Sequence, residues 1–201
     1  MESLRDWSIA LNRRQSVDVI YIDFRKAFDS VSHPKLIIKL VSAGISGNLL
    51  NWIKAFLTNR TQSVKVADSL SNKIMVTSGV PQGSVLGPTL FVIFINDIAD
   101  ILIDLNITMK LFADDVKMYS VVDLGISSDL LLACDRLMKW AETWQMDIAV
   151  QRCSVLRVTN KINDLQIAPQ AYQLNNVPLP WGSDCRDLGV LIDGRLNFNS
   201  H

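Results

Sequence analysis

The chain contains at residues 17–23 the stretch VDVIYID, a run of β-branched and aromatic residues that ends on Asp23. Such a run predicts a buried β-strand. A second apolar stretch, residues 109–120 (MKLFADDVKMYS), is interrupted by the pair Asp114-Asp115, which predicts a tight hairpin with two carboxylates at its tip. These acids converge if the two segments are neighbours in one sheet, so the two segments together decide the fold and the site.

Helices and further strands are expected around these segments. Apolar residues at helical spacing predict helices over residues 34–44, 47–58, 89–103 and 129–146. Alternating or apolar runs predict strands at residues 62–67, 73–77, 153–158 and 188–192, the first two paired around a turn at residues 69–72. Residues 78–88 (SGVPQGSVLGP) form a turn-rich loop. The combination of these helices and strands predicts an α+β fold with helices packed on one face of the sheet.

The composition indicates one globular unit rather than two joined domains. With 201 residues, 49% of them hydrophobic, and a mean hydropathy of +0.21, the chain can bury a sizeable core, which excludes disordered and fibrous classes. The longest apolar run, residues 90–95, is too short to cross a bilayer, and the amino terminus lacks the pattern of a secretory signal. We therefore expect an intracellular protein without a membrane partner. The three cysteines lack a Cys-x-x-Cys spacing, which predicts core thiols.

The charges cancel overall but change along the chain. Twenty basic and twenty acidic residues give no net charge, which argues at first against a nucleic-acid partner. Residues 1–65 carry ten basic and five acidic residues, residues 66–135 carry three and nine, and residues 136–201 carry seven and six. The acidic middle is either solvated surface or a cluster that binds divalent cations.

Asp23, Asp114 and Asp115 each have an ordinary explanation when considered singly. An acid at a strand end can cap a helix, and paired aspartates are favoured in turns. Brought together, the carboxylates repel one another and raise one another's pKa unless a counter-ion is present. Two Mg²⁺ ions held about 3.5–4 Å apart by such carboxylates serve in-line phosphoryl transfer. The combination predicts a nucleotidyl-transfer site.

Three motifs follow one another along the chain. They are YIDFRKAFD at residues 21–29, GVPQGSVLGP at residues 79–88 and FADD at residues 112–115. In order and spacing they resemble the reverse transcriptases of non-LTR (LINE-type, jockey-like) retrotransposons. The resemblance implies a polymerase palm, a ferredoxin-like antiparallel sheet with helices packed on one face. Residues 1–16 would then be a residual fingers or lead-in segment, and residues 17–201 a palm truncated before the thumb.

The resemblance also implies roles for individual residues. Asp23, Asp114 and Asp115 match the catalytic, metal-binding carboxylates, which implies two Mg²⁺ ions, with Mn²⁺ as a substitute. Phe28 matches an aromatic that lies under the sugar and discriminates against a 2′-hydroxyl; the ordinary alternative is a core phenylalanine. The implied nucleotide-binding residues are Phe24, Arg25, Lys26, Ala27, Phe28, Gln82 and Gly83, and Asp29, Ser84 and Asn96 are further candidates.

The chain departs from the family pattern at Arg152. The family commonly has lysine before the cysteine that is Cys153 here, and this lysine is a candidate proton donor to the leaving pyrophosphate. Arginine keeps its proton up to about pH 12 and is a poor general acid, although it can stabilise phosphate charge. We therefore expect slower turnover. The family's fingers and thumb would lie before Met1 and after His201, so the palm alone should bind primer-template weakly.

The resemblance implies an RNA-directed DNA polymerase that extends a DNA 3′-hydroxyl with deoxynucleoside triphosphates. Its expected partners are an RNA template, a DNA primer and the rest of a retrotransposon polyprotein, which would supply fingers, thumb and an endonuclease. The alternative is a catalytically inactive relic that folds as a palm and at most binds RNA or a partner protein. A nucleotide cyclase is a weaker third hypothesis. Nuclear and cytoplasmic ribonucleoprotein particles both stay open as locations.

Overall fold

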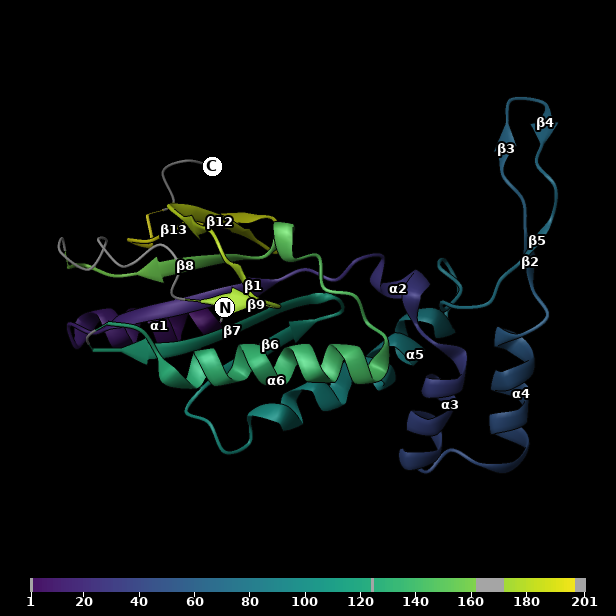
Figure 1. Ribbon diagram of the computed structural model, residues 1–201, viewed down its shortest axis with the longest axis horizontal. Coiled ribbons are helices and arrows are strands. Elements are labelled where there is room, and N and C mark those ends of the chain that lie inside the picture. Colours follow the sequence, from purple (N-terminus) through teal and green to yellow (C-terminus); the bar gives the residue numbers. More distant parts are fainter. Residues whose placement is uncertain (1, 124, 162–171, 198–201) are drawn as a thin grey trace. The chain divides into compact units, whose positions relative to one another are not determined.

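The computed structural model describes residues 2–123, 125–161 and 172–197. These residues form two compact units, each built from more than one stretch of the chain. Of the described residues, the first unit comprises 2–24, 99–123, 125–141, 148–161 and 172–197, and the second comprises 25–98 and 142–147. Figure 1 shows the helices and strands of both units.

A five-stranded sheet with the order β11-β8-β1-β7-β6 is the centre of the first unit. Its middle strand, β1 (Ser16–Ile22), runs antiparallel to both β7 (Asp115–Val122) and β8 (Ser154–Val158). Strand β6 (Thr108–Phe112) pairs antiparallel with β7, and β11 (Trp181–Gly182) pairs parallel with β8. The predicted strand and hairpin are therefore neighbours in one sheet.

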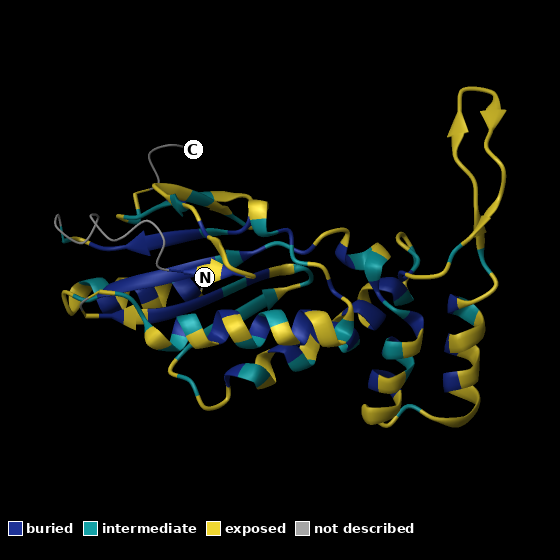
Figure 2. Cartoon of the chain, in the orientation of Figure 1, coloured by how far each residue is buried: buried dark blue, intermediate teal, exposed yellow. Residues whose placement is uncertain are grey.

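Both faces of β1 are buried, as its β-branched and aromatic residues predict (Figure 2). On one face, Val17 and Val19 join a core cluster with Tyr119 and with Trp7 of α1 (Glu2–Asn12). The Trp7 and Tyr119 rings meet edge to face, with their centroids 5.7 Å apart. Helix α1 thus covers the start of β1. The sequence predicted only a fingers or lead-in segment over residues 1–16 and no helix there.

Helix α6 (Ser128–Trp144) runs alongside the strands in Figure 1, and its residues up to Ala141 belong to the first unit. Its buried stripe includes Leu130, Leu137 and Trp140. The turn η2 (Val150–Arg152) leads into β8. Two small antiparallel ladders complete the unit: β9 (Gln173–Leu174) with β10 (Val177–Pro178), and β12 (Asp184–Asp187) with β13 (Val190–Asp193).

The second unit is mainly helical. Its helices are α2 (Ala27–Ser30), α3 (His33–Ser42), α4 (Gly47–Leu57) and α5 (Leu86–Ile95). Helix α5 continues into the 3₁₀ helix η1 (Asn96–Leu102), of which residues 96–98 belong to this unit. Between α4 and α5 the chain forms a long exposed arm. Its base is the ladder of β2 (Thr61–Gln62) with β5 (Ile74–Met75), and its tip is the ladder of β3 (Lys65–Val66) with β4 (Ser69–Leu70) (Figure 1).

The structure corrects three predicted boundaries. The arm reverses at residues 67–68, between β3 and β4, rather than at residues 69–72. Helix α5 begins at Leu86, inside the segment predicted as a loop, and residues 96–102 are 3₁₀ rather than α-helical. Finally, the turn of the acidic hairpin consists of Ala113 and Asp114, so Asp115 is the first residue of β7.

Candidate active site

Asp23, Asp114 and Asp115 lie at one end of two neighbouring strands. Asp23 directly follows β1, whose last residue, Ile22, pairs with Val116 of β7. Asp115 directly precedes Val116, and Asp114 lies in the turn before it. The antiparallel register therefore brings the carboxylate after β1 to the carboxylate pair before Val116.

Local backbone features fix these carboxylates. Ala113 adopts a left-handed conformation (φ 52°), which allows the hairpin to reverse within two residues. The carbonyl of Asp23 accepts a hydrogen bond from the Ala149 amide at 2.8 Å, and its own amide donates to Sγ of Cys153 at 3.4 Å. The segment that follows α6 thus holds the end of β1 in place.

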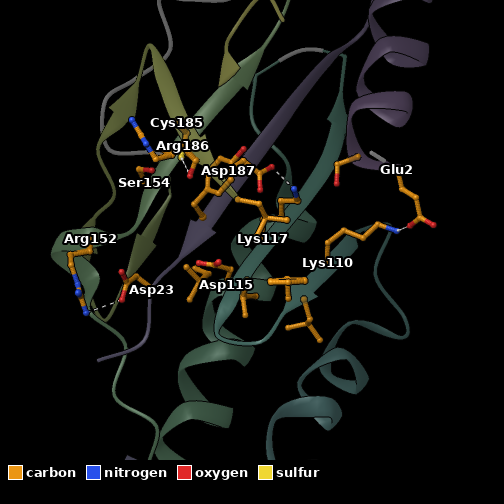
Figure 3. Close-up of a pocket in the computed structure, with 17 residues that line it drawn as sticks. Glu2, Asp23, Lys110, Asp115, Lys117, Arg152, Ser154, Cys185, Arg186 and Asp187 are labelled. Carbon is orange, nitrogen blue, oxygen red and sulfur yellow. Dashed lines mark hydrogen bonds and ion pairs between the residues drawn. The ribbon is translucent and has the colours of Figure 1, made fainter. Parts of the chain in front are cut away.

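The end of the sheet forms a pocket of about 450 Å³ (Figure 3). Asp23 and Asp115 line it, together with basic side chains from several elements. Asp114 is half-buried beside the pocket. The charged residues that line the pocket are Glu2, Asp23, Lys110, Asp115, Lys117, Arg152, Arg186 and Asp187.

The electrostatic environment raises the pKa of Asp115 above that of an ordinary aspartate. Partial burial is the largest cause, and the negative charges of Asp114, Asp187 and Asp23 add to it, whereas Lys117 opposes it. Three neighbouring carboxylates thus disfavour the ionised form of Asp115, and Lys117 favours it. A divalent cation would relieve this repulsion.

Arg152 forms an ion pair with Asp23, with Nη2 and Oδ1 2.8 Å apart (Figure 3). Nη2 also donates to the carbonyl of Phe24 at 3.4 Å. The two side chains are 58% and 40% exposed, so solvent screens the pair and it contributes little to stability. The ion pair matters because of where it lies: the guanidinium of Arg152 contacts Asp23, a carboxylate that the resemblance assigns to metal binding.

Several residues of the pocket were missed by the sequence analysis. Lys117 forms an ion pair with Asp187, which joins β7 to β12 beside Asp115 (Figure 3). Tyr21 lines the pocket with a buried hydroxyl that has no hydrogen-bond partner among the described residues. Tyr21 lies two residues before Asp23, and Lys117 lies two residues after Asp115. Strand alternation alone would have placed each on the face of its carboxylate.

The donor set fits a magnesium ion. Among the described residues, no group of three or more His, Cys, Asp or Glu side chains forms a preformed metal cage. Mg²⁺ does not require such a cage, because it keeps several waters and binds one or two protein carboxylates together with substrate phosphates. Asp23 and Asp115 supply hard oxygen donors in one pocket, and their mutual repulsion favours a cation there.

The segment from Phe24 to Phe28 bends into α2. Phe24 is buried against Trp140, with ring centroids 6.3 Å apart, whereas the side chains of Arg25 and Lys26 are exposed. The Arg25 amide donates to the carbonyl of Asp147 at 2.7 Å, and Lys26 adopts a left-handed conformation. Ala27 is buried. The role of this segment in triphosphate binding stays a prediction.

Phe28 combines the two interpretations that the sequence left open. Its ring stacks on the buried Phe91, with centroids 4.2 Å apart and planes 15° apart, as a core residue would. The side chain is nevertheless only half-buried. One face of the ring is therefore fixed by packing, and part of its surface is available for a ligand.

Gln82 and Gly83 lie in the exposed loop before α5. Nε2 of Gln82 donates to Oδ1 of Asp29 at 2.8 Å, so the loop contacts the segment that follows Phe28. Gly83 has a positive φ of 77°, and space is open where a Cβ would lie. Ser84 donates to the carbonyl of Pro81 at 2.6 Å and is half-buried, and Asn96 is exposed at the end of α5.

Asp115→Asn is expected to stabilise the metal-free chain. The raised pKa means that the ionised carboxylate disfavours the folded state above that pKa, and this penalty is absent below the ordinary aspartate pKa. Asparagine removes the charge, so the free energy of unfolding at pH 7 should increase, by less than about 1 kcal/mol because the side chain is exposed. Urea denaturation in EDTA measures this difference, which should vanish near pH 3. A less stable variant at pH 7 would contradict the prediction.

The described elements define a class of protein. A mostly antiparallel sheet carries carboxylates at one end of adjacent strands, as in the palm of a template-dependent polymerase. Solved structures share the fold. One is telomerase from Candida tropicalis in complex with a TWJ fragment of telomeric RNA. It aligns with a TM-score of 0.68 at 10% identity, over 99% of this chain and 32% of that one. Telomerase from Candida albicans aligns with a TM-score of 0.65 at 13% identity, over 96% of this chain and 32% of that one. The predicted α+β palm fold is confirmed.

The chain belongs to the reverse transcriptase family. The family model described as reverse transcriptase (RNA-dependent DNA polymerase) matches residues 1–190. The RNA-directed DNA polymerase from mobile element jockey of Drosophila funebris is 31% identical over 199 residues, 96% of this chain and 21% of the relative. A probable RNA-directed DNA polymerase from transposon X-element of Drosophila melanogaster is 28% identical over 196 residues, with 96% and 21% covered. The predicted relationship to non-LTR retrotransposons is confirmed, and the chain spans about a fifth of the length of these relatives.

In the part of the chain that the structure describes, no helix is both long enough and apolar enough to span a membrane.

Proposed function

We propose that this chain is the catalytic palm of an RNA-directed DNA polymerase, which extends a DNA 3′-hydroxyl with deoxynucleoside triphosphates on an RNA template. The observation that carries the proposal is the arrangement of Asp23, Asp114 and Asp115 at one end of β1 and β7, beside a pocket. Membership of the reverse transcriptase family supports it, as do the names of the relatives.

Two Mg²⁺ ions, or Mn²⁺ in their place, are the proposed cofactors. Asp23, Asp114 and Asp115 would hold them, and the ions would activate the attacking 3′-hydroxyl and stabilise the leaving pyrophosphate. The chain itself contributes fixed carboxylates whose charges repel one another, which favours cation binding. Arg152 would leave Asp23 when a metal binds and could then pair with phosphate oxygens, a role that needs charge but no proton transfer.

The nucleotide would bind through residues of the second unit. Arg25 and Lys26 present exposed cations suited to a triphosphate, and Gln82 presents an exposed amide that can both donate and accept. Gly83 allows close approach of a ligand to the backbone. The proposed partners are an RNA template, a DNA primer and the other segments of a retrotransposon polyprotein, in a nuclear or cytoplasmic ribonucleoprotein.

Primer extension tests the proposal directly. The purified chain is incubated with a DNA primer on an RNA template, all four deoxynucleotides, and either Mg²⁺, Mn²⁺ or EDTA. Extension that requires both metal and template supports the proposal. Cyclic nucleotide formed from a triphosphate without primer would favour the cyclase alternative instead.

Phe28→Val is expected to weaken discrimination against ribonucleotides. A smaller side chain would leave room for a 2′-hydroxyl, so the ratio of kcat/KM for a deoxynucleotide over its ribonucleotide should fall about tenfold or more. Single-nucleotide incorporation measures the ratio. Phe56→Val is the matched control, because Phe56 stacks on Trp52 of α4 in a similar way, with planes 16° apart. An unchanged ratio would leave Phe28 as a core residue only.

An inactive relic is the second candidate, and the observation that favours it is the Arg152–Asp23 ion pair. In a relic the guanidinium would permanently occupy the carboxylate. Electron paramagnetic resonance, which detects bound Mn²⁺, distinguishes the polymerase from the relic. Binding that Asp23→Asn weakens supports the polymerase, and no binding at millimolar Mn²⁺ supports the relic.

A further inference from the structure

The backbone carbonyl of Gly79 receives side chains from two separate elements of the second unit. Nε2 of His33, at the start of α3, lies 2.8 Å from this oxygen, and Nη2 of Arg60 donates to it at 3.1 Å. Because a carbonyl can only accept, His33 must carry its proton on Nε2. His33 is only 8% exposed, although it is a polar residue next to a proline. The two donors together use both lone pairs of the carbonyl oxygen.

Further contacts fix Gly79 against the segment that follows Phe28. The Gly79 amide donates to the carbonyl of Val31 at 2.8 Å, and the Val80 amide donates to that of Phe28 at 2.9 Å. Gly79 has a φ of 85°, and a Cβ there would lie 2.8 Å from the backbone of Asp29. The chain therefore has one well-defined path at this point, and only glycine allows it.

The side chain of Gln82 is held less firmly than the backbone on either side of it, where Gly79 is fixed and Ser84 donates to the Pro81 carbonyl at 2.6 Å. Gln82 and Gly83 are exposed, and the hydrogen bond from Gln82 to Asp29 joins two exposed side chains. Such a bond exchanges readily with water and contributes little by itself. The position of Gln82 therefore depends on the backbone that flanks it, and Gly79, three residues before it, is the fixed point on the preceding side.

Arg60 connects this fixed point to the rest of the unit. Its Nε donates to the carbonyl of Leu57 at the end of α4, at 2.9 Å, while Nη2 holds Gly79. Its own carbonyl accepts from the Val76 amide at 2.9 Å, which closes the base of the arm. Arg60 thus links α4 to the loop through its guanidinium and to the arm through its backbone carbonyl.

We infer that His33 and Arg60 are positioning residues, which fix the loop of residues 79–83 through the Gly79 carbonyl and thereby place Gln82 for nucleotide binding. Neither residue touches the nucleotide in this assignment. The nucleotide part of the inference rests on the proposed function, whereas the fixing of the loop does not.

The test compares His33→Leu, Arg60→Gln and the double variant with the parent chain. Hydrogen exchange of the Gly79 and Val80 amides, resolved by NMR, reports whether the loop is fixed. Each single variant should speed this exchange about fivefold, since each loses one hydrogen bond, and the double variant should speed it by more than tenfold. His33→Gln should restore slow exchange, because its side-chain amide can donate in place of Nε2–H. Lys54→Gln, at an exposed cation of α4, is the matched control and should leave the exchange unchanged.

Steady-state extension gives the second readout. The KM for the deoxynucleotide should rise about fivefold in each single variant, while the KM for primer-template and kcat change less than twofold. Unchanged amide exchange in the double variant would overturn the inference. Equal increases in both KM values together with a lower unfolding midpoint would also overturn it, because they indicate a structural role only. If the parent chain extends no primer, the proposed function fails, and amide exchange alone then decides whether the loop is fixed as inferred.

Discussion

Replacing Asp114 and Asp115 together with asparagine is expected to reduce metal-dependent primer extension by at least about a thousandfold, the equivalent of roughly 4 kcal/mol of transition-state stabilisation. Asparagine has nearly the same shape and is also favoured in turns, so the hairpin between β6 and β7 should be retained. The substitutions remove the two negative charges that adjoin Asp23 at the end of β1. The proposed metal ions would then lack most of their protein ligands.

The same variant separates loss of chemistry from loss of folding. Since the carboxylates repel one another in the metal-free chain, the variant should be at least as stable as the parent. Asp135→Asn is the matched control, because Asp135 is an exposed aspartate of α6 that does not line the pocket. Its extension rate should equal that of the parent. A doubly substituted chain that extends primers at more than a tenth of the parental rate would refute the assignment of these carboxylates.

The elements that carry the carboxylates were predictable because their sequence patterns are strong. Apart from Asp18, residues 17–22 are all β-branched or aromatic, and such a run is typical of a strand that is buried on both faces. The acidic pair could be assigned to a turn because a carboxylate disfavours the interior of a strand. The sequence pattern did not predict which residues form the turn between β6 and β7. Asp115 pairs with Phe112 within the ladder, and only Ala113 and Asp114 form the reversal.

The errors lie where the sequence pattern gives weak constraints. Every residue of the four arm strands is exposed, so no buried face fixes their register, and the predicted turn was shifted by about two residues. Pro88 suggested that the loop continued, yet proline is tolerated in the first turn of a helix, and α5 begins at Leu86. Asp187 could not have been assigned to the pocket, because it reaches Lys117 only through the packing of β12 on the sheet.

The buried pair of Asp18 and Arg157 was also not recognised from the sequence, and it leads to the largest expected effect on stability. The two residues are register partners on β1 and β8, and they are 0% and 4% exposed. Nε of Arg157 donates to Oδ1 at 2.6 Å, and Nη2 donates to Oδ2 at 2.7 Å. Tyr172 donates a further bond to Oδ2 at 2.6 Å, and Gly125 accepts one from Arg157 at 2.7 Å. Both carboxylate oxygens of Asp18, and Nε and Nη2 of Arg157, thus have hydrogen-bond partners in the buried interior.

Asp18→Asn is expected to lower the free energy of unfolding by about 3–5 kcal/mol, because it leaves the Arg157 guanidinium buried without a counter-charge. Urea denaturation followed by circular dichroism measures this change. The matched control is Asp104→Asn, which breaks the exposed Arg–Asp pair with Arg136 and should have a far smaller effect. The double variant Asp18→Leu/Arg157→Leu should recover most of the lost stability, since it removes both charges together. If the double variant were as unstable as Asp18→Asn, the hydrogen bonds to Tyr172 and Gly125, rather than the unpaired charge, would be what joins β8 to the strand that leads to Asp23.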